Sequence, residues 1–192
     1  PVNEPLPVIP AAHFTMGGIE VDVNGATRIG GIFAAGECAC VSVHGANRLG
    51  GNALLECLVF GKIAGIEAAK YASTHTNNSG TVSILNNVNE SDRLIESILS
   101  RKEGVSSYLI EEKLRAAMWM HAGLFRKREE LERELTMISE LKKMYKNVYI
   151  GDSSKVFNMA LYETLELGNM LMLAENVVLA ALMREESRGA HT

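Results

Sequence analysis

The sequence predicts an α+β chain, in which short strands and one buried helix precede an all-α helical bundle. Period-two alternation and glycine-rich turns are confined to residues 16–51, whereas the apolar pattern after residue 82 is helical. A polar, turn-rich stretch at 74–81, Thr-His-Thr-Asn-Asn-Ser-Gly-Thr, separates the two parts. We therefore expect two domains, at 1–76 and 82–192.

Composition excludes some classes of function before any motif is considered. Of the 192 residues, 47% are hydrophobic, which is enough for a packed core. The formal net charge of −4 argues against a nucleic-acid partner, because such proteins present a basic face. The three cysteines, Cys38, Cys40 and Cys57, are too few and too clustered for a disulfide framework. With no second cysteine pair, we also expect no metal site.

Short strands are expected in the first forty residues. Residues 19–23 alternate with period two and are predicted to form a strand. Asn24-Gly25 is a strong hairpin signal, so residues 26–29 are expected to pair back as the second arm. Residues 32–35 are wholly apolar, which is typical of a short strand buried in a sheet.

A loop of small residues leads from these strands into a helix at 52–73. Glycines around Arg48 allow a ligand to approach the backbone closely. The helix start then offers free N–H groups and a positive dipole end to an anion or an electron-rich ring. Apolar residues cover much of the helix circumference, so we expect the helix to be deeply buried. These are Leu54, Leu55, Leu58, Val59, Phe60, Ile63 and Ile66.

Helices account for most of the second half. Residues 90–102 are predicted to form a short amphipathic helix capped by Asn89. Residues 107–121 and 124–146 form either one long helix or two helices broken near Gly123.

Leu124, Leu131 and Ile138 recur every seven residues, which indicates a packed seam between helices. The charged run at 126–134 allows i,i+4 ion pairs and is interpreted as a solvated face.

The last predicted helix covers residues 154–187, with Gly151-Asp152-Ser153 offering its N-cap. It is long and apolar, but it carries Glu163, Glu166 and Glu175. Three such charges are costly in a bilayer, so we expect a soluble or peripheral protein rather than a membrane span.

Two side chains stand out as candidates for binding a ligand. His13 precedes a glycine turn, and Arg48 lies in the small-residue loop, where His44 is expected to shape the backbone. Their settings resemble the flavoprotein subunit of succinate dehydrogenase and fumarate reductase. The matching strings are His-Phe-Thr-Met-Gly-Gly-Ile at 13–19, Gly-Ile-Phe-Ala-Ala-Gly-Glu-Cys at 31–38, His-Gly-Ala-Asn-Arg-Leu-Gly-Gly-Asn at 44–52 and Glu-Ser-Arg-Gly-Ala-His at 186–191.

The resemblance implies roles for individual residues. His13 and Arg48 would hold the carboxylates of succinate or fumarate, which agrees with the bidentate grip of a guanidinium on a carboxylate. Glu37 would hydrogen-bond hydroxyls of FAD. Asn52, Ala53 and Leu54 would contact the cofactor where the helix begins, with the Ala53 and Leu54 N–H groups facing the flavin ring.

The resemblance also implies the fold: the C-terminal part of an FAD-binding α/β domain, followed by the helical domain. The glycine-rich loop for the FAD pyrophosphate has no match, and the family's proton-donating arginine lies outside the chain, so no catalytic residue is assigned. The parent protein would be an enzyme of electron transport and the tricarboxylic acid cycle. The isolated chain, an internal fragment on this interpretation, is expected to be inactive.

Implied partners are the dicarboxylate substrate, the missing flavin-domain segments and an iron–sulfur subunit of a membrane-associated complex. The implied location is cytoplasmic, peripheral on the inner face of the membrane. Two alternatives remain open. One is an L-aspartate oxidase-like flavoprotein, suggested by Leu-Leu-Glu-Cys-Leu-Val at 54–59. The other is a helical scaffold that has no catalytic role on its own.

Overall fold

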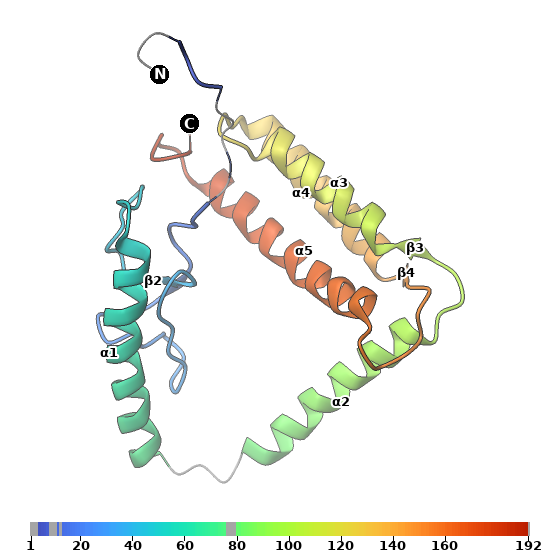
Figure 1. Cartoon of the computed structure of the whole chain (residues 1–192), viewed down its shortest axis with the longest axis horizontal. Coiled ribbons are helices and arrows are strands. Elements are labelled where there is room, and N and C mark those ends of the chain that lie inside the picture. Colours follow the sequence, from blue (N-terminus) through green and yellow to red (C-terminus); the bar gives the residue numbers. More distant parts are fainter. Residues whose placement is uncertain (1–3, 8–10, 12, 76–79, 192) are drawn as a thin grey trace. The chain divides into compact units, whose positions relative to one another are not determined.

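The structure is a computed structural model that describes residues 4–7, 11, 13–75 and 80–191, without the side chains of residues 80–87. The chain divides into two compact units, Pro1–Asn77 and Asn78–Thr192 (Figure 1). Within the predicted turn-rich stretch at 74–81, residues 76–79 lie outside the described residues. Each unit is described by itself.

The first unit contains strands β1 (Ile19–Glu20) and β2 (Ala39–Cys40) and helix α1 (Asn52–Thr74). β1 and β2 pair in parallel, with Ile19 opposite Ala39. Gly18 precedes β1 with a φ of 120°, and a Cβ at this position would lie 2.4 Å from the Cys38 carbonyl oxygen. Only glycine allows the two strands to approach so closely at this point.

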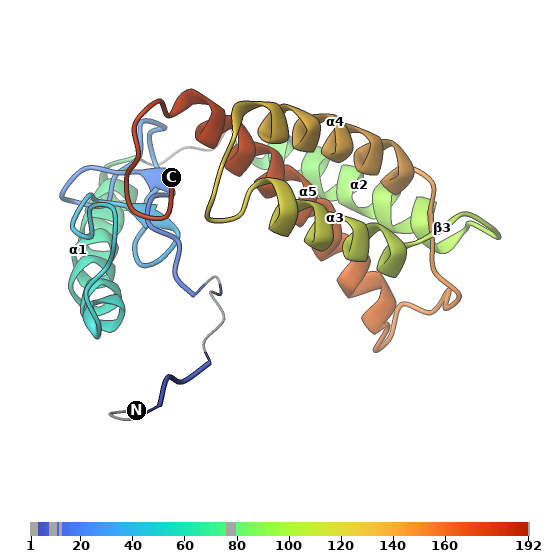
Figure 2. The same cartoon turned by 90° about the horizontal axis from the view of Figure 1, so that it is seen from above.

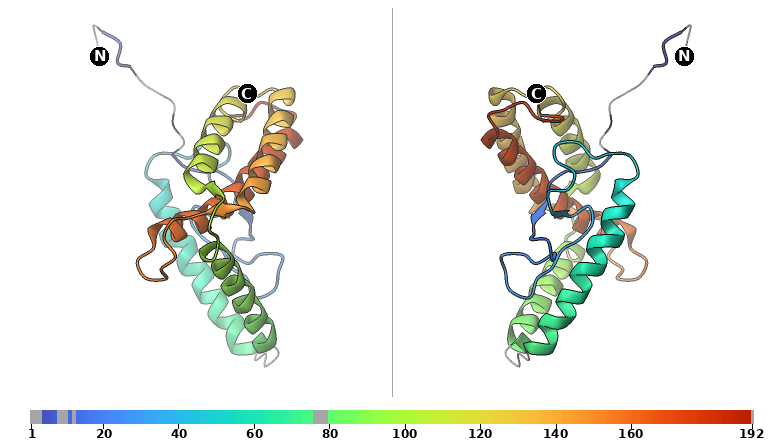
Figure 3. Two further views of the ribbon diagram at one scale, coloured as in Figure 1. Left: turned by 90° about the vertical axis from the view of Figure 1, so that its right-hand side faces the viewer. Right: turned by 90° about the vertical axis from the view of Figure 1, so that its left-hand side faces the viewer.

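Loops of the first unit lie along one side of α1 (Figure 3). Gly25, with a φ of 76°, approaches the helix so closely that a Cβ would lie 2.6 Å from the Cβ of Ala64. Further along the helix, the ring of Phe33 meets that of Tyr71 edge to face at 6.1 Å. These contacts hold the turn at Gly25 and the segment around Phe33 against the second half of α1.

The strand predictions are only partly correct. The turn at Asn24-Gly25 forms, because the Asp22 carboxylate accepts the N–H groups of Asn24 and Ala26. The expected second arm reduces to a single antiparallel bridge between Ala26 and Phe33. The apolar run at 32–35 is not a buried strand, and Ile32 is exposed. β1 pairs with β2 and not with this run, and a short apolar run fits an extended loop as well as a strand.

Helix α1 matches the predicted range to within a residue, but the prediction that it is deeply buried is wrong. Only Glu56 and Ala64 are buried along it, and Leu54 is 74% exposed. The loops cover one narrow strip of the helix, so the rest of its apolar surface faces outward. Leu55, Leu58, Val59 and Ile66 are exposed with it.

The described part of the second unit contains four helices and two short strands. These are α2 (Gly80–Leu99), β3 (Val105–Ser106), α3 (Ser107–His121), α4 (Arg128–Tyr145) and β4 (Val148–Tyr149), followed by α5 (Met159–Met183). α4 packs against α3 and α5, as Figure 2 shows. β3 and β4 form a second parallel pair, with Val105 opposite Val148.

One apolar core joins the helices of the second unit. Its fully buried members come from all four helices and from β4 and its flanks. They are Ile98, Ile110, Leu114, Ala122, Leu131, Ile138, Leu141, Val148, Ile150, Leu167, Leu171, Ala174, Val178 and Ala181.

Two predicted N-caps in this unit are wrong. Asn89 lies inside α2, because asparagine's preference for a cap is small beside a continuing helical hydrogen-bond ladder. The cap of α5 is Asn158, whose side chain accepts the N–H of Leu161 at 2.9 Å, and not residues 151–153. α3 and α4 are two separate helices, as one of the two alternatives had it.

The charged run at 126–134 is solvated only in part. Arg128 and Glu132 form the expected exposed pair at 3.8 Å. Arg126 instead donates from Nε to the Gly123 carbonyl at 2.9 Å. Glu134 is wholly buried, which contradicts the prediction, because it falls in the same inward row as Leu131 and Ile138. Leu124 lies before α4 and is exposed, so the seam lacks its first predicted member.

Helix α5 is the one helix in the described part of the chain that is long and apolar enough to cross a membrane. Length and composition alone support that possibility. Six of its residues face inward, among them Leu167, Leu171 and Val178, which belong to the core of the second unit. A helix at the centre of a bundle has the same composition.

Candidate functional site

Three separate segments of the first unit meet near Phe14. The Glu37 carboxylate accepts the backbone N–H of Thr15 at 2.9 Å, which fixes the segment after His13 to the turn before β2. The ring of Phe14 then contacts side chains of the small-residue loop, His44 on one side and Arg48 on another. The fold therefore brings the two predicted ligand-binding segments together.

The Arg48 guanidinium lies over the Phe14 ring, with Cζ 4.6 Å from the ring centroid. Nη1 donates to the carbonyl of Leu49 at 2.9 Å. Nε is buried and has no acceptor among the described residues. A guanidinium carries five N–H donors, so most of its capacity remains for an anionic ligand.

The start of α1 lies directly after this loop. Gly51 leads into the helix with a φ of 83°, and no side chain caps the first turn. The Asn52 N–H donates to the Leu49 carbonyl at 3.2 Å, and the first turn contains no acidic residue. The uncapped N–H groups and the dipole therefore make the region around Ala53 and Leu54 attractive to a negative or electron-rich group.

Behind the loop, a buried contact between a histidine and a glutamate joins the loop to α1. His44 Nε2 lies 2.7 Å from Glu56 Oε2, and the two side chains are 10% and 2% exposed. A cavity of about 220 Å³ adjoins this pair. Its lining includes Asn52 and is completed by Val43, Leu55, Val59 and Phe60.

The predicted residues occupy different depths. His13 and Glu37 are exposed, Arg48, Asn52 and Ala53 are half-buried, and Leu54 is exposed at the helix start. The feature of this arrangement that suits a cofactor such as FAD is the uncapped start of α1. Among the described residues, no group of three or more His, Cys, Asp or Glu could hold a metal ion.

Sequence reasoning missed Phe14 and Glu56. Phe14 stands between a candidate histidine and a glycine turn, and nothing in its pattern marks it as a platform for an arginine. Glu56 lies in an apolar helical run, where a lone acidic residue is itself an indication of a buried polar contact. A carboxylate on an inward-facing helix position needs a partner, and His44 provides one.

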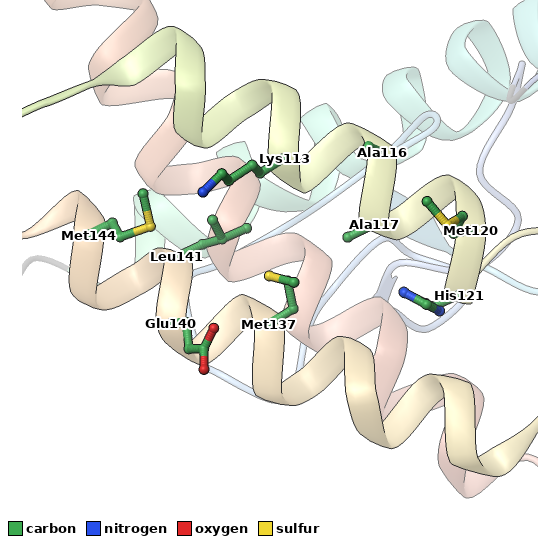
Figure 4. A pocket seen from close by; sticks show the side chains of 9 residues that line it. All are labelled: Lys113, Ala116, Ala117, Met120, His121, Met137, Glu140, Leu141 and Met144. Atoms are coloured by element: carbon green, nitrogen blue, oxygen red, sulfur yellow. The ribbon is translucent and has the colours of Figure 1, made fainter.

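A larger hollow of about 350 Å³ lies in the second unit, between α3 and α4 (Figure 4). Its lining is mainly methionine and alanine, and its His121 already pairs with Glu130 at 2.5 Å. None of the predicted site residues lies there. The lining comprises Lys113, Ala116, Ala117, Met120, His121, Met137, Glu140, Leu141 and Met144.

Comparison with known proteins is consistent along the whole chain. A profile described as FAD binding domain matches residues 1–54, and one described as fumarate reductase flavoprotein C-term matches residues 111–192. The fumarate reductase flavoprotein subunit of Escherichia coli is 42% identical over 191 residues. The succinate dehydrogenase flavoprotein subunit of Rickettsia bellii is 38% identical over 209 residues.

Solved structures give the same result. A quinol fumarate reductase structure from E. coli superposes on 100% of the chain with a TM-score of 0.90 and 41% identity. Mycobacterium smegmatis Sdh1 in complex with UQ1 covers 94% of the chain with a TM-score of 0.84 and 38% identity.

The chain spans only a third of these relatives, 32% of the E. coli subunit and 33% of the Rickettsia one. Its two units correspond to the end of a flavin-binding domain and to a C-terminal helical domain. The chain therefore belongs to the fumarate reductase and succinate dehydrogenase flavoprotein family, as a segment of the full-length subunit.

Proposed function

We propose that this chain supplies the dicarboxylate-binding side chains and part of the FAD-binding surface of an enzyme that interconverts succinate and fumarate. The observation that carries the proposal is the position of Arg48, held over Phe14 immediately before the uncapped start of α1. The loop thus carries a cation that could bind a carboxylate, and it ends at a helix N-terminus that could face a flavin.

Arg48 and His13 would orient the substrate. A planar guanidinium binds a carboxylate through two parallel N–H donors, and an imidazole adds a charge-assisted hydrogen bond. The two segments are joined by the contact of Phe14 with Arg48, which suits two groups that grip opposite ends of a short dicarboxylate. Neither group needs to transfer a proton in this role.

FAD, when bound, would supply the two-electron redox chemistry. The N–H groups at Ala53 and Leu54 would stabilise negative charge on the reduced ring, because the helix dipole is positive there. Glu37 would reach FAD hydroxyls with its exposed carboxylate, one oxygen of which already accepts the Thr15 N–H. Asn52 would face the cofactor from the first helical position.

The remaining parts of the enzyme would come from outside this segment. They are the pyrophosphate loop, the proton donor and the iron–sulfur subunit of a complex on the cytoplasmic face of the membrane. The solved structures named above include a quinol fumarate reductase from E. coli. We propose the same assembly here.

The test uses the complete flavoprotein that contains this segment. Arg48→Leu should abolish succinate-dependent bleaching of the flavin while FAD stays bound, as measured by visible absorption. The matched control is Arg28→Leu, since Arg28 is an exposed arginine of the same unit that pairs with the exposed Glu20. Normal turnover in Arg48→Leu would reject the proposal. Bleaching by L-aspartate but not by succinate would favour the oxidase alternative.

A further inference from the structure

Two buried ionisable side chains of the first unit have no role in the proposed function. Glu56 and His44 are 2% and 10% exposed, and they are joined at 2.7 Å. Burying a charged group is costly unless the group is paired and hydrogen-bonded. Such a pair, one turn into α1 and behind a ligand-binding loop, suggests a purpose beyond packing.

The pair is linked to Arg48 through an aromatic ring. His44 meets Phe14 edge to face, with ring centroids 5.4 Å apart and planes at 86°. The second partner of Phe14 is the Arg48 guanidinium, whose Cζ lies 4.6 Å from the ring centroid. The positive edge of one ring toward the face of another is a favoured geometry, as is a cation over a face.

Each contact in this series restricts the next. The Glu56 carboxylate holds Nε2 of His44, which fixes the orientation of the imidazole. The imidazole limits the tilt of Phe14, and the phenyl face limits where the guanidinium can lie. The hydrogen bond from Nη1 to the Leu49 carbonyl adds a second restraint on the guanidinium.

We propose that Glu56 and His44 are positioning residues for Arg48, acting through the Phe14 ring. The proposal rests on the proposed function, since Arg48 must bind a dicarboxylate for its position to matter. A guanidinium that is already oriented loses less side-chain freedom when a carboxylate binds, which raises affinity. Disturbing the series should weaken dicarboxylate binding without displacing FAD.

The experiment measures the Kd of malonate, a dicarboxylate that cannot be oxidised at this site, from the change that it causes in the flavin spectrum. The complete flavoprotein is used. Phe14→Leu removes the cation–π contact and should raise the Kd about 2- to 30-fold, the range that such contacts contribute. Glu56→Gln should raise the Kd within the same range.

Matched controls separate positioning from loss of structure. Glu67→Gln is the same change on the same helix, at a surface residue that pairs with Lys70. Phe33→Leu is the same change at a ring that packs on Tyr71. Both controls should leave the malonate Kd unchanged, and all variants should retain FAD.

The double variant Glu56→Gln/Phe14→Leu gives the sharpest readout. If the two residues act in series, the double variant should raise the malonate Kd no more than the larger of the two single variants does. If each change damages the structure independently, the two increases in Kd should multiply. Multiplied losses, or unchanged Kd values in both single variants, would overturn the proposal even where Arg48→Leu abolishes binding. Unchanged binding in Arg48→Leu would instead reject the proposed function. If Glu56→Gln does not fold, Phe14→Leu and His44→Gln repeat the test in the same form.

Discussion

Glu134 provides the sharpest test of how the helical unit is stabilised. Its side chain is 0% exposed, and neither carboxylate oxygen has a hydrogen-bond partner among the described residues. Burial raises the pKa of this carboxyl, an effect that the nearby His121 partly offsets. We expect Glu134→Leu to stabilise the protein, because leucine fills a similar volume and has no polar group to desolvate.

The size of the effect follows from the unsatisfied group. Burying a polar group without a partner costs about 1–3 kcal/mol in mutational data, so Glu134→Leu should gain about that much. With a urea dependence of about 1–3 kcal/mol per molar for small proteins, the unfolding midpoint should rise on the order of 1 M. The exposed Glu132 is the control, and Glu132→Leu should change stability by less than about 0.5 kcal/mol.

The variant Glu134→Gln tests how the charge of this carboxyl affects stability, because glutamine has a similar shape and no charge. Between the carboxyl's pKa in the unfolded chain and its raised pKa in the folded protein, the folded state keeps a proton that the unfolded state has lost. Stability therefore falls as the pH rises across that interval. Glutamine removes this loss, so the variant should match the unmodified protein below the pKa of the unfolded carboxyl and exceed it increasingly as the pH rises above that pKa.

The assay is urea unfolding of the full chain at several pH values, followed by the fluorescence of Trp119. Trp119 is the single tryptophan of the sequence and lies on α3, so it reports on the helical unit alone. If the stability advantage of Glu134→Gln instead stayed constant or shrank as the pH rose, the pKa of Glu134 would not be raised in the folded protein.

Three further outcomes are expected. Gly18→Ala should destabilise the β1–β2 pair by about 1–3 kcal/mol, because the new Cβ would meet the Cys38 carbonyl at 2.4 Å with φ at 120°. Amide hydrogen exchange of β1 would measure it, with Gly50→Ala as a control, since a Cβ there meets nothing within 4 Å. Asn158→Ala should lower the stability of the protein by about 1 kcal/mol, because it removes the N-cap of α5. Asn169→Ala, at an exposed position within α5, should not destabilise the protein, and thermal unfolding compares the two variants. The 192-residue chain alone should retain no FAD after desalting and should not oxidise succinate. Retained flavin that bleaches with succinate would show that this segment holds a working site.

Helix positions could be predicted from the sequence because periodicity and length extend over many residues. α1, α3 and α4 lie close to where the apolar pattern put them. β1 lies within the strand predicted at 19–23, but β2 and its pairing with β1 could not be predicted, because each strand has two residues and the pairing depends on a close approach at Gly18. A pattern of two residues carries no period.

The candidate site was predictable where a motif carries it and not where geometry does. Arg48 and His13 follow from glycine settings and family resemblance, and the structure brings their segments together through Phe14. The link from Glu56 to His44 spans 12 positions and depends on how the loop folds back on α1. No local pattern encodes such a distance.

Glu56 and Glu134 show why a buried acid cannot be interpreted from burial alone. Both lie on inward-facing positions of helices and are almost wholly removed from water. Glu56 has an imidazole at 2.7 Å, so replacing its carboxylate with a neutral amide weakens the hold on His44 and should weaken the site. Glu134 has no such partner, so removing its charge relieves a cost. The same substitution to glutamine should therefore weaken ligand binding at one position and stabilise the fold at the other. A helix tolerates an unpaired buried acid only at a cost in stability, whereas a paired one beside an open loop can hold a neighbouring cation in place for a ligand.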